Sequence, residues 1–270
     1  RTGDNMTDYI KKKRRKKYKG NVARVPISFV HSMGHIWATQ KVRITDFRPK
    51  PWRSGNSFYS LYEPVSLSPW DLQNYLMVLH VLQNPKIYTL KKDEYGFDRY
   101  RILFQMKDIY NLLNIPYKGS GRGDLKESII NHCGTVLRVI RPDEDIIYWG
   151  LGLNAGTVKF EGIGRSGLTC ELTPYKALID NKNKLFSENI TRILKYRFGM
   201  SKLIDFYVLG KLNAGVSLTE KGWMSSLSRG DRLDIFQKSF YPALQELADV
   251  SFNVKRDEAG NITVKYVNRE

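Results

Sequence analysis

The feature that most constrains this chain is the order of secondary-structure elements predicted for residues 200–267. Residues 201–212 carry apolar side chains at helical spacing, and residues 217–227 predict a shorter helix that opens with Ser-Leu-Thr-Glu. A longer amphipathic helix follows, in which large apolar residues recur every three or four positions: Leu233, Phe236, Phe240, Leu244 and Leu247. Residues 250–255 and 262–267 flank a polar turn and predict a β-hairpin. The segment therefore predicts a helix, a short helix, a longer helix and a hairpin.

A looser version of this order lies upstream, in residues 68–153. Ser68, Pro69 and Asp71 give a helix start signal, namely an N-cap serine, a proline at the first helical position and an acid at the third. The pattern then predicts a strand at 101–104, helices at about 107–113 and 124–133, and strands at 135–140 and 146–153. The chain thus carries two units of similar plan.

A helix pair followed by a hairpin is the plan of a winged-helix unit, whose second paired helix enters the major groove of DNA. The sequence therefore predicts an α+β fold with two tandem winged-helix domains. We expect a flexible, disordered basic arm at residues 1–21, a first winged-helix domain with an N-terminal extension at 22–163, and a second winged-helix domain at 164–270. Within 22–66 we expect Trp37, Phe47 and Trp52 to pack on the neighbouring domain, with contact to a nucleic-acid backbone as the alternative.

The charge of the chain indicates the class of its partners. Its 270 residues include 44 Lys and Arg against 27 Asp and Glu, a formal net charge of +17. Such a balance attracts nucleic acid, anionic membranes or acidic proteins. The sequence contains no run of about 18 apolar residues, which a membrane-spanning helix would need. Its two cysteines are far apart in the sequence, which fits a reducing compartment. We therefore expect a cytoplasmic protein associated with the nucleoid or with a plasmid.

A dense basic block occupies residues 11–17, where every residue is Lys or Arg. So many like charges repel one another and bury no apolar face. We expect this arm to contact DNA phosphates through Lys13, Arg14 and Arg15 without sequence preference. A solubilising tail and a targeting signal are the alternatives.

The second unit provides the stronger candidate for reading DNA sequence. The face of its long helix opposite the apolar stripe presents Lys238, Tyr241 and Gln245, flanked by Arg229 and Arg232. Lys and Arg suit guanine or phosphate, and Gln suits adenine. The alternative is that these are ordinary solvated positions, which Asp231 and Asp234 favour because they would repel phosphates.

The first unit provides a weaker candidate. A flexible turn at residues 119–123 is expected to leave backbone N–H groups open to a phosphate, with Lys118 and Arg122 adding charge, and the following helix exposes Lys126 and Asn131. This face is less basic than that of the second unit. We therefore also expect it to serve in dimer or backbone contacts.

Residues 232–247 carry a resemblance to a known family, above all in Phe-Tyr-Pro-Ala-Leu-Gln-Glu-Leu at 240–247. A helix-internal proline such as Pro242 costs roughly 3 kcal/mol and is not expected by chance. The segment resembles the C-terminal recognition region of replication initiators of iteron-type plasmids. The resemblance implies double-stranded DNA binding at direct repeats of an origin, opening of an adjacent AT-rich region, recruitment of a host helicase, and a monomer–dimer switch.

Two other function classes fit the same pattern. A winged-helix transcriptional regulator would use the same contacts at a promoter, and a basic structural or RNA-binding protein would grip phosphates without reading sequence. Direct repeats in the bound DNA would favour the initiator, and a palindrome would favour the regulator. Binding without sequence preference would favour the structural or RNA-binding protein.

The residues give no support to catalysis, a cofactor or a metal site. His31 and His35 are four apart, but Met33-Gly34 makes a helix there doubtful and no carboxylate completes the set. The glycines of residues 162–167 match a dinucleotide-binding turn, yet a strand and not a helix follows them. We therefore expect a protein that is not an enzyme and needs no cofactor.

Overall fold

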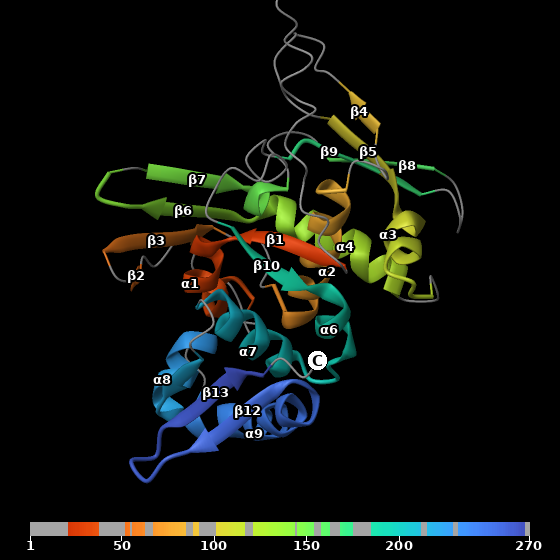
Figure 1. Ribbon diagram of the computed structural model, residues 1–270. Coiled ribbons are helices and arrows are strands. Elements are labelled where there is room, and N and C mark those ends of the chain that lie inside the picture. The colour runs from red at the N-terminus through yellow and green to blue at the C-terminus, as the bar shows by residue number, and fades with distance from the viewer. Residues whose placement is uncertain are drawn as a thin grey trace, which may run out of the picture.

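Figure 1 shows the computed structural model, in which helices alternate with antiparallel sheets. The mixed α/β class agrees with the α+β composition expected from the sequence. The structure describes residues 21–37, 52–54, 56–62, 67–84, 89–91, 101–116, 121–143, 145–153, 158–162, 168–174, 185–211, 215–228 and 232–267. No helix in these ranges is long and apolar enough to cross a membrane.

The helices are α1 (Ile27–Ile36), α2 (Pro69–Leu82), α3 (Met106–Leu112), α4 (Gly121–Gly134), α6 (Ile190–Lys195), α7 (Gly199–Gly210), α8 (Glu220–Leu227) and α9 (Leu233–Val250), with a 3-10 turn η1 (Gly150–Gly152). The strands are β1 (Val22–Pro26), β2 (Trp52–Ser54), β3 (Ser57–Tyr62), β4 (Thr89–Lys91), β5 (Arg101–Gln105), β6 (Val136–Ile140), β7 (Asp145–Trp149), β8 (Lys159–Glu161), β9 (Thr169–Leu172), β10 (Leu185–Asn189), β11 (Val216–Leu218), β12 (Phe252–Arg256) and β13 (Ile262–Tyr266).

The C-terminal part has the three helices and the hairpin that the sequence predicts. Helices α7, α8 and α9 precede the hairpin β12–β13, and the short strand β11 extends it into a sheet of order β11–β13–β12. Strand β11 was not expected, because its partner β13 lies far away in the sequence (Val216 pairs with Val264) and periodicity reports only local structure.

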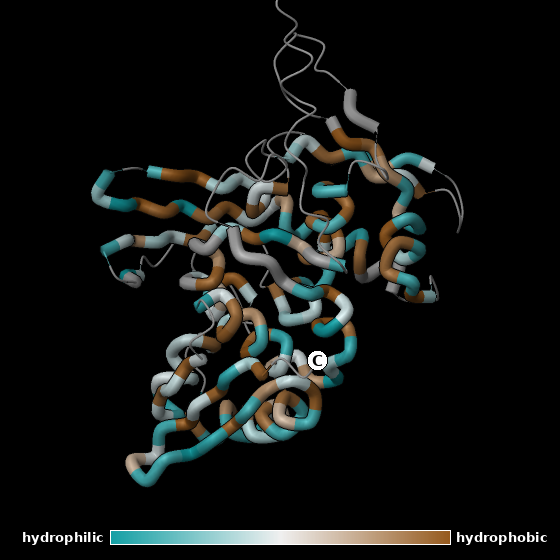
Figure 2. The backbone as a smooth tube through the Cα atoms, viewed as in Figure 1, coloured by the Kyte–Doolittle hydropathy of each residue, from teal (hydrophilic) through white to brown (hydrophobic). Residues whose placement is uncertain are grey.

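Helix α9 owes its position to its apolar stripe. Phe236, Phe240, Leu244 and Leu247 are buried, as the spacing of three and four predicts, and Leu233 is partly buried. Hydrophobic and hydrophilic segments accordingly alternate along this helix (Figure 2). Burying each large apolar side chain contributes roughly 1.5–3 kcal/mol before entropy is counted. The opposite face is therefore left to solvent.

The start signal of α2 is confirmed. The backbone N–H of Ser68 donates to Asp71 Oδ2 over 2.8 Å, and the backbone N–H of Asp71 donates to Ser68 Oγ over 3.3 Å. This reciprocal capping box satisfies two N–H groups that the first turn of a helix leaves without a partner. Helix α2 then runs to Leu82, as expected.

The order of elements in residues 69–149 is confirmed, but its strands pair differently from those of the C-terminal part. Strand β5 pairs with β4 and β9, whereas the hairpin β6–β7 is extended by β3 and then β2. The strand before the helix pair and the hairpin after it therefore belong to two different sheets.

Helix α4 begins at Gly121 and not at Asp124, so the flexible turn expected at 119–123 is wrong for residues 121–123. Glycine disfavours a helix by about 1 kcal/mol relative to alanine. Packing outweighs that cost, because Leu125 and Ile129 of this helix are buried and α4 lies against α2.

Helix α1 was also not expected, because Gly34 and the irregular pattern around it argued against a helix. The structure explains the glycine through close packing. An alanine Cβ at Gly34 would lie 2.3 Å from the carbonyl oxygen of Ser226 in α8, and one at Gly210 of α7 would lie 2.2 Å from Val30 Cγ2 of α1. Helix α1 is therefore wedged against α7 and α8 of the C-terminal part.

The chain crosses more than once between its N-terminal and C-terminal parts. Strand β1 pairs with β10, and β9, beyond the boundary expected at residue 164, pairs with β5. Trp37 is fully buried, with its ring centroid 5.4 Å from that of Tyr75 and 5.8 Å from that of Phe206. Trp37 contacts Phe206 of the C-terminal part, in line with the predicted packing on the neighbouring domain. Trp52 instead stacks on His35 and Tyr59 of its own part, and Phe47 lies outside the described residues.

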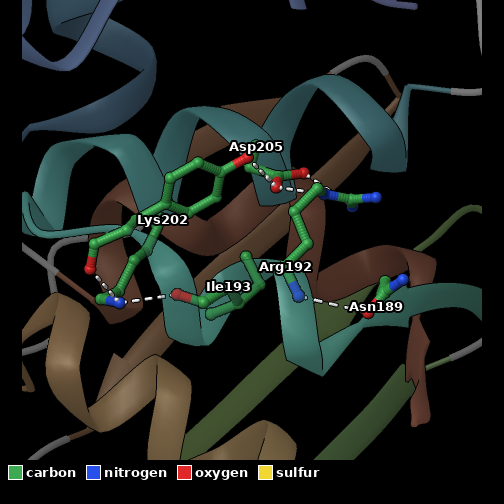
Figure 3. Close-up of polar contacts among 6 residues, drawn as sticks. Asn189, Arg192, Ile193, Lys202 and Asp205 are labelled. Atoms are coloured by element: carbon green, nitrogen blue, oxygen red, sulfur yellow. Dashed lines mark hydrogen bonds and ion pairs between the residues drawn. The ribbon is translucent and has the colours of Figure 1, made fainter. Parts of the chain in front are cut away.

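A buried polar cluster joins α6 to α7 (Figure 3). Asp205 accepts hydrogen bonds from Arg192 Nε at 2.6 Å, from Arg192 Nη2 at 3.0 Å and from the Tyr196 hydroxyl at 2.8 Å. Lys202 Nζ donates to the carbonyl oxygens of Ile193 at 2.7 Å and Tyr196 at 2.9 Å. Burial raises the pKa of Asp205, which Arg192 opposes, and it lowers the pKa of Lys202 to about 8. These hydrogen bonds offset the free-energy cost of burying the polar groups of the cluster.

His132 is a buried, neutral histidine. Trp37 Nε1 donates to His132 Nε2 over 3.1 Å, and His132 Nδ1 lies 2.6 Å from the carbonyl oxygen of Ser128. Only the neutral ring with its proton on Nδ1 satisfies both contacts. Burial lowers the pKa of His132 from 6.5 to about 4.

Protonating His132 should therefore destabilise the protein. Its folded pKa lies below its unfolded value, so the unfolded chain binds more protons between pH 6.5 and 4. Stability is lost as the pH falls through this window, by about 2 kcal/mol from this group at pH 5. Denaturant unfolding at pH 8 and pH 5 measures the loss. In His132→Gln, whose amide oxygen can still accept the hydrogen bond from Trp37, the loss of unfolding free energy between pH 8 and pH 5 should be smaller by about 2 kcal/mol. An unchanged pH dependence would contradict the assignment.

Candidate nucleic-acid interface

The outward face of α9 brings together three of the residues predicted to read DNA. Lys238, Tyr241 and Gln245 are all exposed, and Arg232, which directly precedes the helix, is exposed as well. They point away from the buried stripe because residues three, four and seven apart share one side of a helix. The structure therefore presents these side chains on one surface.

Two of these side chains have acidic neighbours. Arg232 Nη2 lies 2.7 Å from Asp234 Oδ2, and Gln245 Nε2 donates to Asp249 Oδ1 over 3.2 Å. The guanidinium of Arg232 lowers the pKa of Asp234. Both contacts are solvent-exposed, so exchanging them for contacts to DNA costs little.

Glu220, at the start of α8, fixes the centre of this surface. Its carboxylate accepts hydrogen bonds from Tyr241 and from Gln237 Nε2 (2.5 Å) and lies 3.2 Å from Arg256 Nη2. The hydrogen bond with Tyr241 is the largest influence on the carboxyl, and it lowers the pKa of Glu220 and raises that of Tyr241. This carboxylate thus holds α8, α9 and β12 in one fixed arrangement.

The hairpin β12–β13 adds cations that the sequence reasoning missed. Lys255, Arg256 and Lys265 are exposed, while Phe252, Ile262 and Val264 on these strands are buried. The alternation of polar and apolar residues already predicted the hairpin, and its exposed positions were the available signal. Lys255 and Lys265 lie on the face of the hairpin opposite the buried Ile262 and Val264, whereas Arg256 reaches Glu220.

Of the residues predicted on the first unit, Lys126 and Asn131 do not share one exposed face. Lys126 lies with its Nζ 5.4 Å from the ring centroid of Phe160, and Asn131 is partly buried. At about 100° per residue, positions five apart face different sides of a helix. Among the described side chains of α4, Glu127 and Ile130 are exposed and Lys126 is partly buried. Arg122 falls in its first turn.

Five of the predicted DNA-contact residues fall outside the ranges that the structure describes. They are Lys13, Arg14, Arg15, Lys118 and Arg229. The same applies to the whole arm before residue 21.

The string Pro-Ala-Leu-Gln-Glu-Leu, which carries the family resemblance, packs α9 against α7. Glu246 accepts hydrogen bonds from the backbone N–H of Arg197 at 2.6 Å, from that of Phe198 at 3.2 Å and from Ser201 Oγ at 2.6 Å. These groups lie at the N-terminus of α7, where N–H groups lack helical partners. Ala243 is buried beside them, whereas Pro242 is exposed. Most of this string therefore supports the fold.

Comparison with known proteins identifies the fold. A crystal structure of selenomethionine derivatives of domain 2 and domain 3 of RctB matches with a TM-score of 0.56 and 12% identity, covering 89% of this chain and 98% of that chain. A second crystal structure, of RctB domains 2–3, matches with a TM-score of 0.51 and 10% identity, covering 87% and 96%. No protein-family model matches this chain. No curated protein matches it either. At such identity the likeness shows a shared fold.

Proposed function

We propose that this protein is a sequence-specific double-stranded DNA-binding protein that initiates replication at the direct repeats of an origin. It would do so through two tandem winged-helix units, with no catalytic step and no cofactor. The observation that carries the proposal is the arrangement of α8, α9 and β12–β13. An exposed polar helix face lies beside a hairpin with exposed cations, which is the plan of a winged helix that reads the major groove.

Two further observations support the initiator over other DNA-binding proteins. Two solved structures that share this fold are of domains 2 and 3 of RctB, a replication initiator. The resemblance of residues 240–247 to iteron-binding initiators points the same way. The proposal includes a role in opening the origin, recruitment of a host helicase and a monomer–dimer equilibrium.

Selection from a random duplex DNA library near physiological salt tests the proposal. Enrichment of one asymmetric motif about two helical turns long is expected, because two tandem units would read adjacent major grooves. A short inverted repeat would favour a dimeric transcriptional regulator instead. If no sequence is enriched, the net charge of +17 serves only to bind the DNA backbone, which would contradict sequence-specific binding.

Lys238→Ala and Gln245→Ala are expected to reduce discrimination between the selected sequence and random DNA by about 1–3 kcal/mol each. Lys159→Ala removes an exposed lysine from β8 and is the matched control, which should leave discrimination unchanged. Deleting residues 11–19 should weaken binding to all DNA alike, since a phosphate-gripping arm reads no bases. Fluorescence anisotropy on both duplexes measures these effects. Equal losses on both duplexes for the α9 variants would contradict their role in reading bases.

A further inference from the structure

The sheet of order β2–β3–β6–β7 has one buried and one exposed face. Tyr59, Leu137 and Val139 point inward and are buried. Successive side chains of a strand point to opposite faces, so Phe58, Tyr62 and Arg138 point outward. The register places Tyr62 beside Val136, and Val136 beside Trp149, in one row across three strands.

Large aromatic rings protrude from the outward face. Phe58, Tyr62 and Trp149 are 49%, 45% and 54% exposed, and Ile147 of β7 adds a further exposed apolar side chain. Hydrophobic segments occur on both strands of the hairpin β6–β7 (Figure 2). A cluster of exposed apolar side chains on one surface is typical of a binding site, whereas single exposed residues are ordinary.

The charged groups on this face are mainly cationic. Arg53 lies with its guanidinium carbon 5.5 Å from the ring centroid of Phe58. Arg138, in the centre, holds the face's one described carboxylate, Asp145, through contacts of 3.0 and 2.5 Å. Arg138 and Asp145 thereby neutralise each other, and the guanidinium of Arg53 lies beside the ring of Phe58. This combination suits a ligand with both flat rings and negative charge.

We propose that this aromatic sheet face binds single-stranded DNA, with unpaired bases stacking on Tyr62, Trp149 and Phe58. Aromatic side chains beside cations on a sheet bind single strands in this way, because every base has a face that can stack. Neighbouring strands lie about 4.8 Å apart, so Tyr62 and Trp149, two strands apart, stand about 10 Å from each other. That separation lets two different bases of one strand engage the two rings.

The aromatic sheet face differs from the α9 surface in the form of DNA it accepts. Bases in a duplex are stacked on each other and reach a protein only by their edges, so stacking on Tyr62 or Trp149 requires separated strands. The hairpin β6–β7 and helix α9 lie in different parts of the molecule (Figure 1). The choice of DNA over RNA as the ligand rests on the proposed function at an origin. The inference that bases stack on this surface does not depend on that function.

Anisotropy of a labelled oligothymidine of about 16 nucleotides with the full chain tests this inference. Tyr62→Ala and Trp149→Ala should each weaken binding roughly 5- to 150-fold, and Trp149→Phe should retain most of it. Phe198→Ala removes a ring that is 44% exposed on the α6–α7 connection and is the matched control. Duplex binding should not change in any of these variants, so a failed initiator proposal is told apart from a failed single-strand site.

Three results would overturn the inference. Oligothymidine binding that is equal in wild type and both alanine variants would show that the rings do not stack on bases. Tighter binding of the matching oligouridine RNA would assign the surface to RNA. A dimer in light scattering that Tyr62→Ala or Trp149→Ala converts to monomer, without loss of oligothymidine binding, would assign it to a second copy of the chain.

Discussion

Replacing Gly34 with alanine is expected to lower the free energy of unfolding by about 3 kcal/mol or more, at the upper end of typical overpacking costs. The added Cβ would lie 2.3 Å from the carbonyl oxygen and 2.9 Å from the carbonyl carbon of Ser226, and 3.0 Å from that of Leu227. These are backbone atoms of α8, so no side-chain rotation relieves the clash and α1 must move away. Chemical denaturation followed by circular dichroism measures the change.

Gly222→Ala is the matched control within α8. Its nearest neighbour would be Leu218 Cβ at 3.2 Å, and alanine favours a helix over glycine by about 1 kcal/mol. We expect a change within about 1 kcal/mol. A Gly34→Ala variant as stable as this control would show that α1 does not need its close approach to α8.

Asp205→Asn is expected to cost about 3–5 kcal/mol, because breaking a buried ion pair leaves an uncompensated charge. Asp205 is fully buried, and its partner Arg192 has only 10% of its side chain exposed. The amide would keep the shape of the side chain but place N–H groups against the donors of Arg192 and Tyr196. The shift of the denaturation midpoint measures the loss.

The exposed pair between Arg138 and Asp145 makes the matching control. Its side chains are 41% and 43% exposed at a separation of 2.5 Å, so water replaces either partner. Asp145→Asn should leave the midpoint unchanged. If Asp205→Asn were equally silent, the cluster of Figure 3 would have no role in joining α6 to α7.

The sequence was informative wherever structure depends on local patterns. The cap of Ser68 on α2 and the apolar stripe of α9 were both predicted, because a capping box and a period of 3.6 are properties of neighbouring residues. The outward position of Lys238, Tyr241 and Gln245 follows from the same stripe.

The features that the sequence did not reveal depend on distant partners. Strands β1 and β11 are short and pair with residues far along the chain. Glu220 is an unremarkable helix-start residue until folding brings Tyr241 and Arg256 to it. Glycine at position 34 signals a broken helix locally, yet it permits α1 to approach α8. Periodicity carries no information about such contacts.

The pairing of β1 with β10 imposes an order on events during protein synthesis. Val22 pairs with Asn189, and Pro26 with Leu185. Ribosomes add roughly 5–20 residues per second, so β1 emerges on the order of ten seconds before its partner exists. Until then the buried Val30 of α1, which lies against Gly210 of α7 in the folded protein, has no C-terminal helix to cover it. The N-terminal part therefore completes its fold only after most of the chain has been made, and an early stop in translation leaves an aggregation-prone fragment.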